Sequence, residues 1–170
     1  MKVLWAPWRM EYINSDQKDE GCIFCPGEDR EEDEERLILY VGSMTIVMMN
    51  RYPYNNGHLL VAPVRHVPEF RDLSGDEVLD LMSLVSRSIE VLRHVMKPEG
   101  FNVGLNIGRV AGAGMEYHMH FHIVPRWNGD TNVMTVLGDV RVIPEHIRET
   151  YGKLKPLFHG VDADKEGFQS

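Results

Sequence analysis

One heptapeptide, His118-Met119-His120-Phe121-His122-Ile123-Val124, constrains the fold of this chain more than any other segment. Histidine alternates with an apolar residue, which is the period of a β-strand with one polar and one buried face. A strand over residues 117–126 would place the three imidazoles on one face. Because a strand rises about 3.3 Å per residue, the first and last backbones of the row would lie about 13 Å apart. One metal ion therefore cannot easily bind all three rings.

The row of imidazoles favours nucleophilic chemistry over metal binding alone. Imidazole is largely unprotonated near neutral pH, and it can form a covalent intermediate that divides a difficult displacement into two steps. We interpret His120, the middle ring, as the nucleophile of a phosphoryl or nucleotidyl transfer. The glycine-rich segment 108–114 precedes the row, and its bare amides can approach anionic oxygens closely. The alternative is an exposed histidine-rich strand that binds metal weakly or binds nothing.

Four further runs of apolar or β-branched residues predict strands, which gives a sheet of about five. The two-residue turn Gly42-Ser43 is expected to join the first pair as a hairpin. The four runs are residues 37–41, 44–50, 58–63 and 101–107.

Two helices complete the predicted α+β domain. Ser74 and Glu77 form a reciprocal capping box at the start of a long helix, which Pro98 ends. A second helix is expected to begin near Pro144 and to end before Lys155-Pro156. Apolar residues recur along the long helix at helical spacing. They are Val78, Leu81, Met82, Val85, Ile89 and Leu92.

Length and charge limit the possible classes of protein. A chain of 170 residues with 43% hydrophobic content fits one domain, predicted over 1–170 with an N-terminal arm at 1–20 and a flexible tail from about 160 to 170. The net charge is −8, but the seven acids around Arg30 account for a local −6. We interpret residues 26–36 as a solvated acidic loop. Duplex nucleic acid is an unexpected partner for such a chain.

The N-terminal residues do not form a signal-peptide core, because Pro7 and Arg9 interrupt them. The chain contains no apolar run of membrane-spanning length. Its two cysteines, Cys22 and Cys25, stand two residues apart and disfavour a disulfide framework. These features predict a cytoplasmic protein without a membrane partner. The cysteine pair is half of a zinc site, which histidines would complete; free thiols or a redox pair are the alternatives.

The histidine row and its surroundings resemble the histidine triad (HIT) superfamily. The resemblance extends from about Trp5 to Leu154, and the signature is specific when its context agrees. That context includes Asn50-Arg51-Tyr52-Pro53, Gly57 to Pro63, Arg65-His66-Val67 and Asp72-Leu73-Ser74. Residues 108–114, 125–132 and 141–144 are similar to the branch that contains bacterial diadenosine tetraphosphate phosphorylases, also called ATP adenylyltransferases.

The resemblance implies a HIT-like fold and a role for each histidine. The fold is an antiparallel sheet with a long central helix and a C-terminal helix, assembled as a homodimer through the long helix and a central strand. By resemblance, His120 is the nucleophile that becomes adenylylated, His122 contacts the phosphate beside the scissile bond, and His58 supports the nucleophile. Asn50 matches a ribose-contacting position.

The resemblance also implies a phosphate cradle and a metal site. Asn106 and the backbone of Gly112, Ala113 and Gly114 match the cradle. Many relatives carry glutamine or serine there, whereas this chain has Gly114 and Met115, which leaves its leaving-group preference open. Zinc-bearing relatives imply a structural zinc with four ligands and no open position for water. The implied ligands are Cys22, Cys25, His66 and His118.

The implied reaction is attack on the α-phosphorus of an adenosine polyphosphate, with diadenosine tetraphosphate as the expected substrate. The adenylyl group would then pass to phosphate or to water. Magnesium would arrive with the polyphosphate. Two alternatives remain open at this point. One is hydrolysis of nucleoside phosphoramidates, and the other is a zinc-stabilised regulator that binds nucleotide without turnover.

Overall fold

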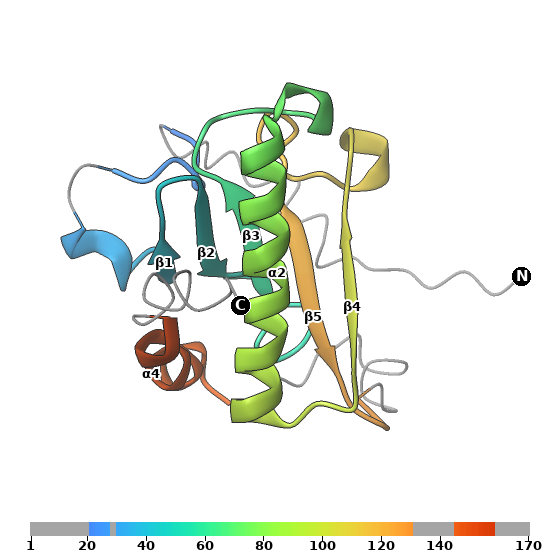
Figure 1. Ribbon diagram of the computed structural model, residues 1–170. Coiled ribbons are helices and arrows are strands. Elements are labelled where there is room, and N and C mark those ends of the chain that lie inside the picture. Colours follow the sequence, from blue (N-terminus) through green and yellow to red (C-terminus); the bar gives the residue numbers. More distant parts are fainter. Residues whose placement is uncertain (1–20, 28–29, 131–144, 159–170) are drawn as a thin grey trace, which may run out of the picture.

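The computed structural model describes residues 21–27, 30–130 and 145–158 and contains a five-stranded antiparallel sheet (Figure 1). The strand order is β1-β2-β3-β5-β4, so β1 and β4 form the two edges. The predicted α+β fold is confirmed. The predicted arm at 1–20 and tail at 160–170 lie outside the described residues. The strands are β1 (Ile38–Val41), β2 (Thr45–Met49), β3 (Leu59–Pro63), β4 (Gly100–Leu105) and β5 (Phe121–Arg126).

A hairpin joins β1 and β2 as predicted, with its turn at Ser43-Met44, one residue later than the predicted Gly42-Ser43. The Gly42 N–H donates to the Thr45 carbonyl at 2.8 Å, and Val41 pairs with Ile46 across the turn. Of the acidic segment 26–36, the described part includes η1 (Glu31–Asp33), a single 3₁₀ turn without buried residues. The other short 3₁₀ turns are η2 (Phe70–Asp72) and η3 (Arg109–Ala111).

The long helix α2 (Gly75–Met96) begins as predicted. The Ser74 side chain accepts from the Glu77 N–H, and the Glu77 carboxylate accepts from the Ser74 N–H. Lys97, in a left-handed conformation, ends it. The buried stripe differs from the prediction at Met82, which is 45% exposed. This stripe follows the face that touches the sheet. It consists of Leu81, Leu84, Val85, Ser88, Val91 and Leu92.

The last helix begins and ends later than predicted. Helix α4 runs over Ile147–Phe158, so it begins after Pro144 and continues through Pro156. A proline inside a helix removes one backbone hydrogen bond and costs about 3 kcal/mol. Leu154 and Phe158 are fully buried on this helix, and burial of such side chains contributes about 1.5–3 kcal/mol each. Packing therefore offsets the cost of the proline.

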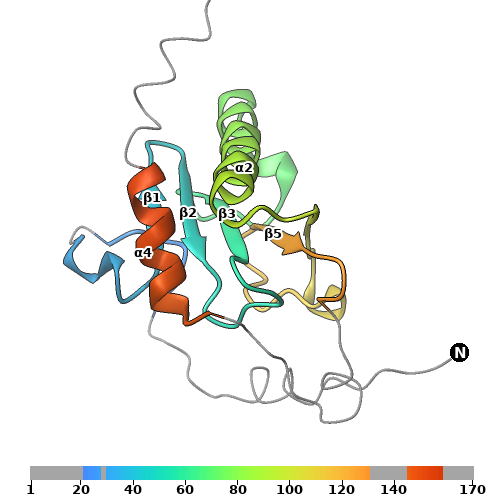
Figure 2. The ribbon, with the colours of Figure 1, turned by 90° about the horizontal axis from the view of Figure 1, so that it is seen from below.

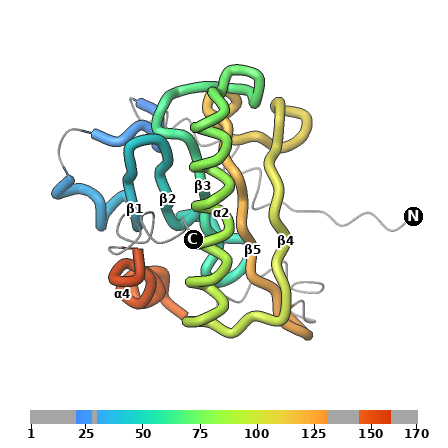
Figure 3. The backbone as a smooth tube through the Cα atoms, viewed as in Figure 1, coloured from blue at the N-terminus to red at the C-terminus, as the bar shows by residue number. Residues whose placement is uncertain are grey.

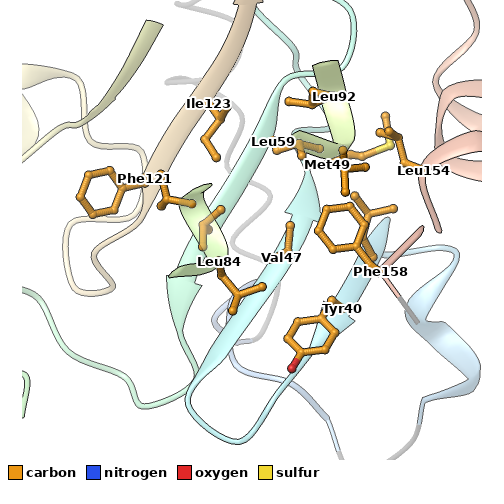
Figure 4. Close-up of a cluster of buried hydrophobic side chains, with 14 of the residues drawn as sticks. Tyr40, Val47, Met49, Leu59, Leu84, Leu92, Phe121, Ile123, Leu154 and Phe158 are labelled. Atoms are coloured by element: carbon orange, nitrogen blue, oxygen red, sulfur yellow. The ribbon is translucent and has the colours of Figure 1, made fainter. Parts of the chain in front are cut away.

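The sheet separates two apolar clusters. Figure 4 shows the larger one, in which side chains of α2 and α4 pack on one face of the sheet. Figure 2 shows α2 on one side of β3 and β5. Along β3, Leu59 and Val61 belong to this cluster, whereas Leu60 and Ala62 belong to the smaller one on the other face. The smaller cluster consists of Phe24, Ile38, Ile46, Met48, Leu60 and Ala62.

No helix in the described part of the chain combines the length and the apolar content that a bilayer crossing requires.

Candidate catalytic and metal-binding site

The histidine row lies on the face of the sheet opposite α2, but only its last member is in a strand. Strand β5 begins at Phe121, so the predicted strand from residue 117 is wrong over its first four residues. Its pairing with β3 and β4 begins at Phe121, which lies opposite Val61 and Leu105. The alternation still holds, because Met119, Phe121 and Ile123 all pack in the α2 cluster. The rings therefore form a row on the opposite side.

His120 is the buried middle ring of the row, with 6% of its surface exposed. Its Nδ1 lies 2.9 Å from the His118 carbonyl oxygen, which can only accept a hydrogen bond. The proton is therefore on Nδ1, and the Nε2 of His120 carries the lone pair. Burial lowers the pKa of the imidazole below its usual value. This arrangement leaves an imidazole of defined tautomer whose Nε2 could act as a nucleophile.

His58 and His122 form a second pair whose tautomers follow from the backbone. The Tyr54 N–H donates to the Nδ1 of His58 at 3.0 Å, so the proton of the buried His58 ring is on Nε2. That Nε2 lies 3.0 Å from the Nδ1 of His122. His122 Nδ1 then accepts, and its Nε2 carries the proton. His122, with its ring 4.9 Å from that of His120, thus becomes a hydrogen-bond donor beside His120.

Asn50 contacts His58, one member of this pair. Its Nδ2 lies 3.3 Å from the Nδ1 of His58, and its Oδ1 accepts from the Tyr52 N–H at 2.9 Å. Asn50 therefore links the backbone after β2 to the orientation of His58. Sequence reasoning missed this role and that of Tyr54. The predicted ribose contact of Asn50 stays a prediction.

The glycine-rich turn is held together largely by its own hydrogen bonds. The Asn106 side chain donates to the Gly112 carbonyl at 3.3 Å. The Gly112 N–H donates to Arg109 at 2.9 Å, and the Ala113 N–H donates to Gly108 at 3.4 Å. Gly112 has a φ of 89°, a conformation that favours glycine. The phosphate cradle at Gly112 to Gly114 stays a prediction, and these contacts show how Asn106 shapes its turn.

Four predicted metal ligands converge at the other end of the row. The ligand atoms of Cys22, Cys25, His66 and His118 all lie within 4.8 Å of one another. The Cys22 Sγ is 3.1 Å and the Cys25 Sγ 3.8 Å from the His118 Nδ1, and the Cys25 Sγ is 3.4 Å from the His66 Nδ1. Tetrahedral zinc, with bonds of about 2.3 Å to sulfur and 2.0 Å to nitrogen, separates these atoms by about 3.5 Å. The donor set and its spacing fit such an ion.

A hydrogen bond from the Nε2 of His118 leaves its Nδ1 able to bind a metal ion. Its Nε2 donates to the Pro63 carbonyl at 2.7 Å, which leaves the lone pair on the Nδ1 that faces the thiols. Burial lowers the pKa of His118 to about 4. The ring is therefore an uncharged ligand at neutral pH.

Arg36 anchors the cysteine turn. Its guanidinium donates to the carbonyls of Ile23 and Cys25 at 2.9 and 2.8 Å. Burial, followed by the neighbouring Cys22, raises the pKa of the Cys25 thiol to about 11. A bound cation would stabilise the thiolate instead. Sequence reasoning missed Arg36, for which its place at the end of the acidic segment gave no signal.

Phe24, between the two cysteines, touches the histidine row. Its ring is stacked on that of His120, with centroids 4.5 Å apart and an interplanar angle of 28°. It also lies 5.3 Å from the His118 ring and is 1% exposed. Sequence reasoning did not single out Phe24, and its position inside the cysteine pair was the only signal.

Residues 30–129, more than half of the chain, match the HIT domain. The chain belongs to the histidine triad family. The HIT protein is 41% identical, over 88% of its length and 80% of the relative's, to a Mycobacterium tuberculosis protein named AP-4-A phosphorylase. It is 28% identical to an adenosine 5'-monophosphoramidase from Schizosaccharomyces pombe, over 75% and 91% of the two chains. Among solved structures, a hypothetical histidine triad nucleotide-binding protein from Sulfolobus tokodaii superposes with a TM-score of 0.60 at 25% identity, covering 86% of this chain and 96% of that one.

The family match places the predicted site residues in two groups. The matched segment of this HIT protein contains every histidine of the site, from His58 to His122, together with Asn50 and Asn106. Cys22 and Cys25 precede it. The structure nevertheless brings the cysteine turn against the row, so that the four candidate metal ligands lie next to His120.

Proposed function

We propose that this HIT protein transfers an adenylyl group from an adenosine polyphosphate through a covalent adenylyl-His120 intermediate. The observation that carries the proposal is the tautomer of His120, which leaves the lone pair on Nε2. A second support is His122, whose donor nitrogen can stabilise charge on the phosphate oxygens.

The proposed reaction has two displacements at one phosphorus. With diadenosine tetraphosphate, the Nε2 of His120 attacks the α-phosphorus and forms an N–P bond while the bond to the bridging oxygen breaks. That oxygen leaves with the electron pair as part of ATP. In the second step an oxygen of inorganic phosphate attacks, the N–P bond breaks and ADP forms. Water in place of phosphate gives AMP and a proton. Splitting the displacement in this way lowers the barrier of each step.

The proposed substrate rests on the relatives. The M. tuberculosis protein, at 41% identity, is named for phosphorolysis of diadenosine tetraphosphate, which supports phosphate as the acceptor here. Magnesium would enter with the polyphosphate. Within the part of the chain that the structure describes, the one cluster suited to a metal consists of Cys22, Cys25, His66 and His118, and thiolates are poor magnesium ligands.

The test compares His120→Asn with the wild type and with His94→Asn, a control at an exposed histidine on α2. Diadenosine tetraphosphate is supplied with and without phosphate, and nucleotides are separated by chromatography. We expect ADP and ATP with phosphate, an adenylyl adduct on His120 by mass spectrometry after acid-free quenching, and a loss of about 10⁴-fold or more in His120→Asn. Full turnover by His120→Asn would refute the mechanism. Nucleotide binding by calorimetry without any product would favour the regulator instead.

A phosphoramidate is the second candidate substrate, because the same nucleophile can expel an amine. The similarity to the S. pombe monophosphoramidase supports this candidate. Comparison of kcat/KM for an AMP-amine conjugate with that for diadenosine tetraphosphate separates the two. We expect the dinucleotide to be preferred, and a higher kcat/KM for the conjugate would reverse the assignment.

We also propose that the cysteine and histidine cluster holds a structural zinc ion. When bound, zinc would tie the N-terminal turn to the sheet, and its four protein ligands would leave no position for an activated water. Metal analysis of the purified protein should find one zinc per chain. The double variant Cys22→Ser, Cys25→Ser should lose it.

The proposed assembly is a homodimer. Figure 3 shows β4 at the edge of the sheet, where Val103 is 42% exposed. Leu79 and Met82 on α2 are 69% and 45% exposed. Apolar groups on an open edge strand and on the adjacent helix suit pairing with a second copy. Light scattering after size exclusion should give twice the mass of the chain, and Val103→Lys should shift it toward the monomer. The cytoplasmic location stays an expectation.

A further inference from the structure

The cysteine turn and the nucleophile are in direct contact. Phe24 lies between the two cysteines, and its ring is stacked face to face on the His120 ring at 4.5 Å. An imidazole that is fixed only by its Nδ1 hydrogen bond can still pivot about that bond. An aromatic ring packed against its face restricts that motion.

A second path joins the same two groups through His118. This residue supplies its Nδ1 to the metal-ligand cluster and its carbonyl to the His120 Nδ1 proton at 2.9 Å. The Pro63 carbonyl fixes the His118 ring from the other side at 2.7 Å. The position of His120 thus depends on Phe24, which lies between the two cysteines, and on the backbone of His118, which is one of the four candidate metal ligands.

We propose that Phe24 is a positioning residue that holds the His120 imidazole in the orientation for attack. The packing of the cysteine turn against the histidine row would then set the geometry of the nucleophile. The inference rests on the proposed function of His120 as the nucleophile. It extends that function by giving the cysteine turn a role in the reaction geometry as well as in stability.

Packing alone is the competing explanation for Phe24. The residue is 1% exposed and belongs to the apolar cluster with Ile46 and Leu60, so its replacement will also destabilise the fold. A useful test must separate orientation of His120 from loss of stability and from loss of metal. Ile46 provides the matched control, since it is fully buried in the same cluster and lies on β2.

The test compares Phe24→Leu, Phe24→Tyr and Ile46→Val with the wild type. Zinc content and the urea midpoint are measured first. Then kcat and KM are determined with diadenosine tetraphosphate and phosphate, and the His120 ring protons are recorded by NMR. For Phe24→Leu we expect retained zinc, an unchanged KM, a fall in kcat of about 10- to 100-fold, and loss of the ring-current shift on His120. Phe24→Tyr keeps the ring and should retain most of kcat and of the shift.

Three results would overturn the inference. The first is a kcat for Phe24→Leu no lower than that of Ile46→Val. The second is a loss of zinc that accounts for the whole defect, because Phe24 would then serve the metal turn alone. The third is an unchanged His120 ring-proton shift in Phe24→Leu. If wild-type protein forms no adenylyl-His120, the proposed function fails instead, and the NMR comparison still tests whether Phe24 orients the ring.

Discussion

Three imidazoles of the site each have their proton assigned by a different backbone group. The Pro63 carbonyl fixes His118, the His118 carbonyl fixes His120, and the Tyr54 N–H fixes His58. The alternation in the sequence predicted that these rings share a face. It could not predict which nitrogen carries the lone pair, because the tautomers depend on backbone groups whose positions relative to the rings are set by the fold. The chemistry of the site therefore depends on backbone geometry that the alternation alone does not specify.

Asn50→Asp tests whether Asn50 orients the histidine pair. A carboxylate cannot donate to the Nδ1 of His58, and it favours a proton on that nitrogen, which would remove the donor that His58 offers to His122. We expect kcat to fall by about 10²-fold, at the lower end of the contribution of a positioned acid–base group. Steady-state kinetics checks this. A rise in KM with unchanged kcat would support the ribose contact instead.

Gly57, directly before His58, requires its small size. Its φ is +72°, and a Cβ there would meet the Met96 side chain and the Leu92 Cδ2 at 3.2 Å. Gly57→Ala should lower the free energy of unfolding by at least about 1–2 kcal/mol. Gly152→Ala is the matched control, because Gly152 lies within α4 with open space around it. That variant should raise stability by up to about 1 kcal/mol. Urea denaturation measures the free energy of unfolding of both variants. Equal changes in the two variants would contradict the expected backbone strain at position 57.

At the scale of elements, the sequence predicted the strands and helices whose ends have a local cause. Ser74 caps α2 by its own side chain, and the first hairpin turns within one residue of the predicted position. The two elements that were wrong at their ends depend on distant contacts. Strand β5 starts only at Phe121, where its pairing with Val61 of β3 begins, and α4 continues through Pro156 because Phe158 is buried. The cysteine half of the metal cluster could be predicted from the residues and its two histidines from the family resemblance, whereas Phe24 and Arg36 required the fold.

The start of α2 gives a pH dependence of stability. Glu77 accepts from the Arg65 guanidinium at 2.8 Å through both oxygens and from the Ser74 N–H, and these bonds lower its pKa from 4.5 to about 2. A carboxyl with a lowered folded pKa adds stability that is fully present above the unfolded pKa. This contribution should be lost as pH falls from about 4.5 to 2. Urea midpoints for wild type and Glu77→Gln across that range measure it, and the two should converge at the acid end. A constant difference would contradict the assignment.

At the scale of the whole molecule, the N-terminal turn closes over the face of the sheet that α2 leaves open. One face is covered by helices, and the other receives Phe24 and the cysteines next to the histidine row. A ligand that binds only the folded state stabilises it by mass action, by about 4 kcal/mol when its concentration is a thousand times Kd.

Removal of the metal should therefore lower the thermal midpoint and slow the formation of adenylyl-His120. Differential scanning calorimetry of chelator-treated protein, before and after zinc is restored, measures the first effect, and quenched-flow mass spectrometry measures the second. Cys22→Ser, Cys25→Ser should match the treated wild type and should not respond to added zinc. An unchanged midpoint would argue against a structural ion.

The bond from the Met119 N–H to the Val67 carbonyl, 2.8 Å long, ties the neighbour of His118 to the neighbour of His66. Val67 and Met119 both pack in the core under α2. The two imidazole ligands are therefore preorganised by folding itself, whereas both sulfur ligands arrive on a short N-terminal segment. A zinc ion bound there would join the segment that carries Cys22 and Cys25 to two imidazoles that the core already holds in place.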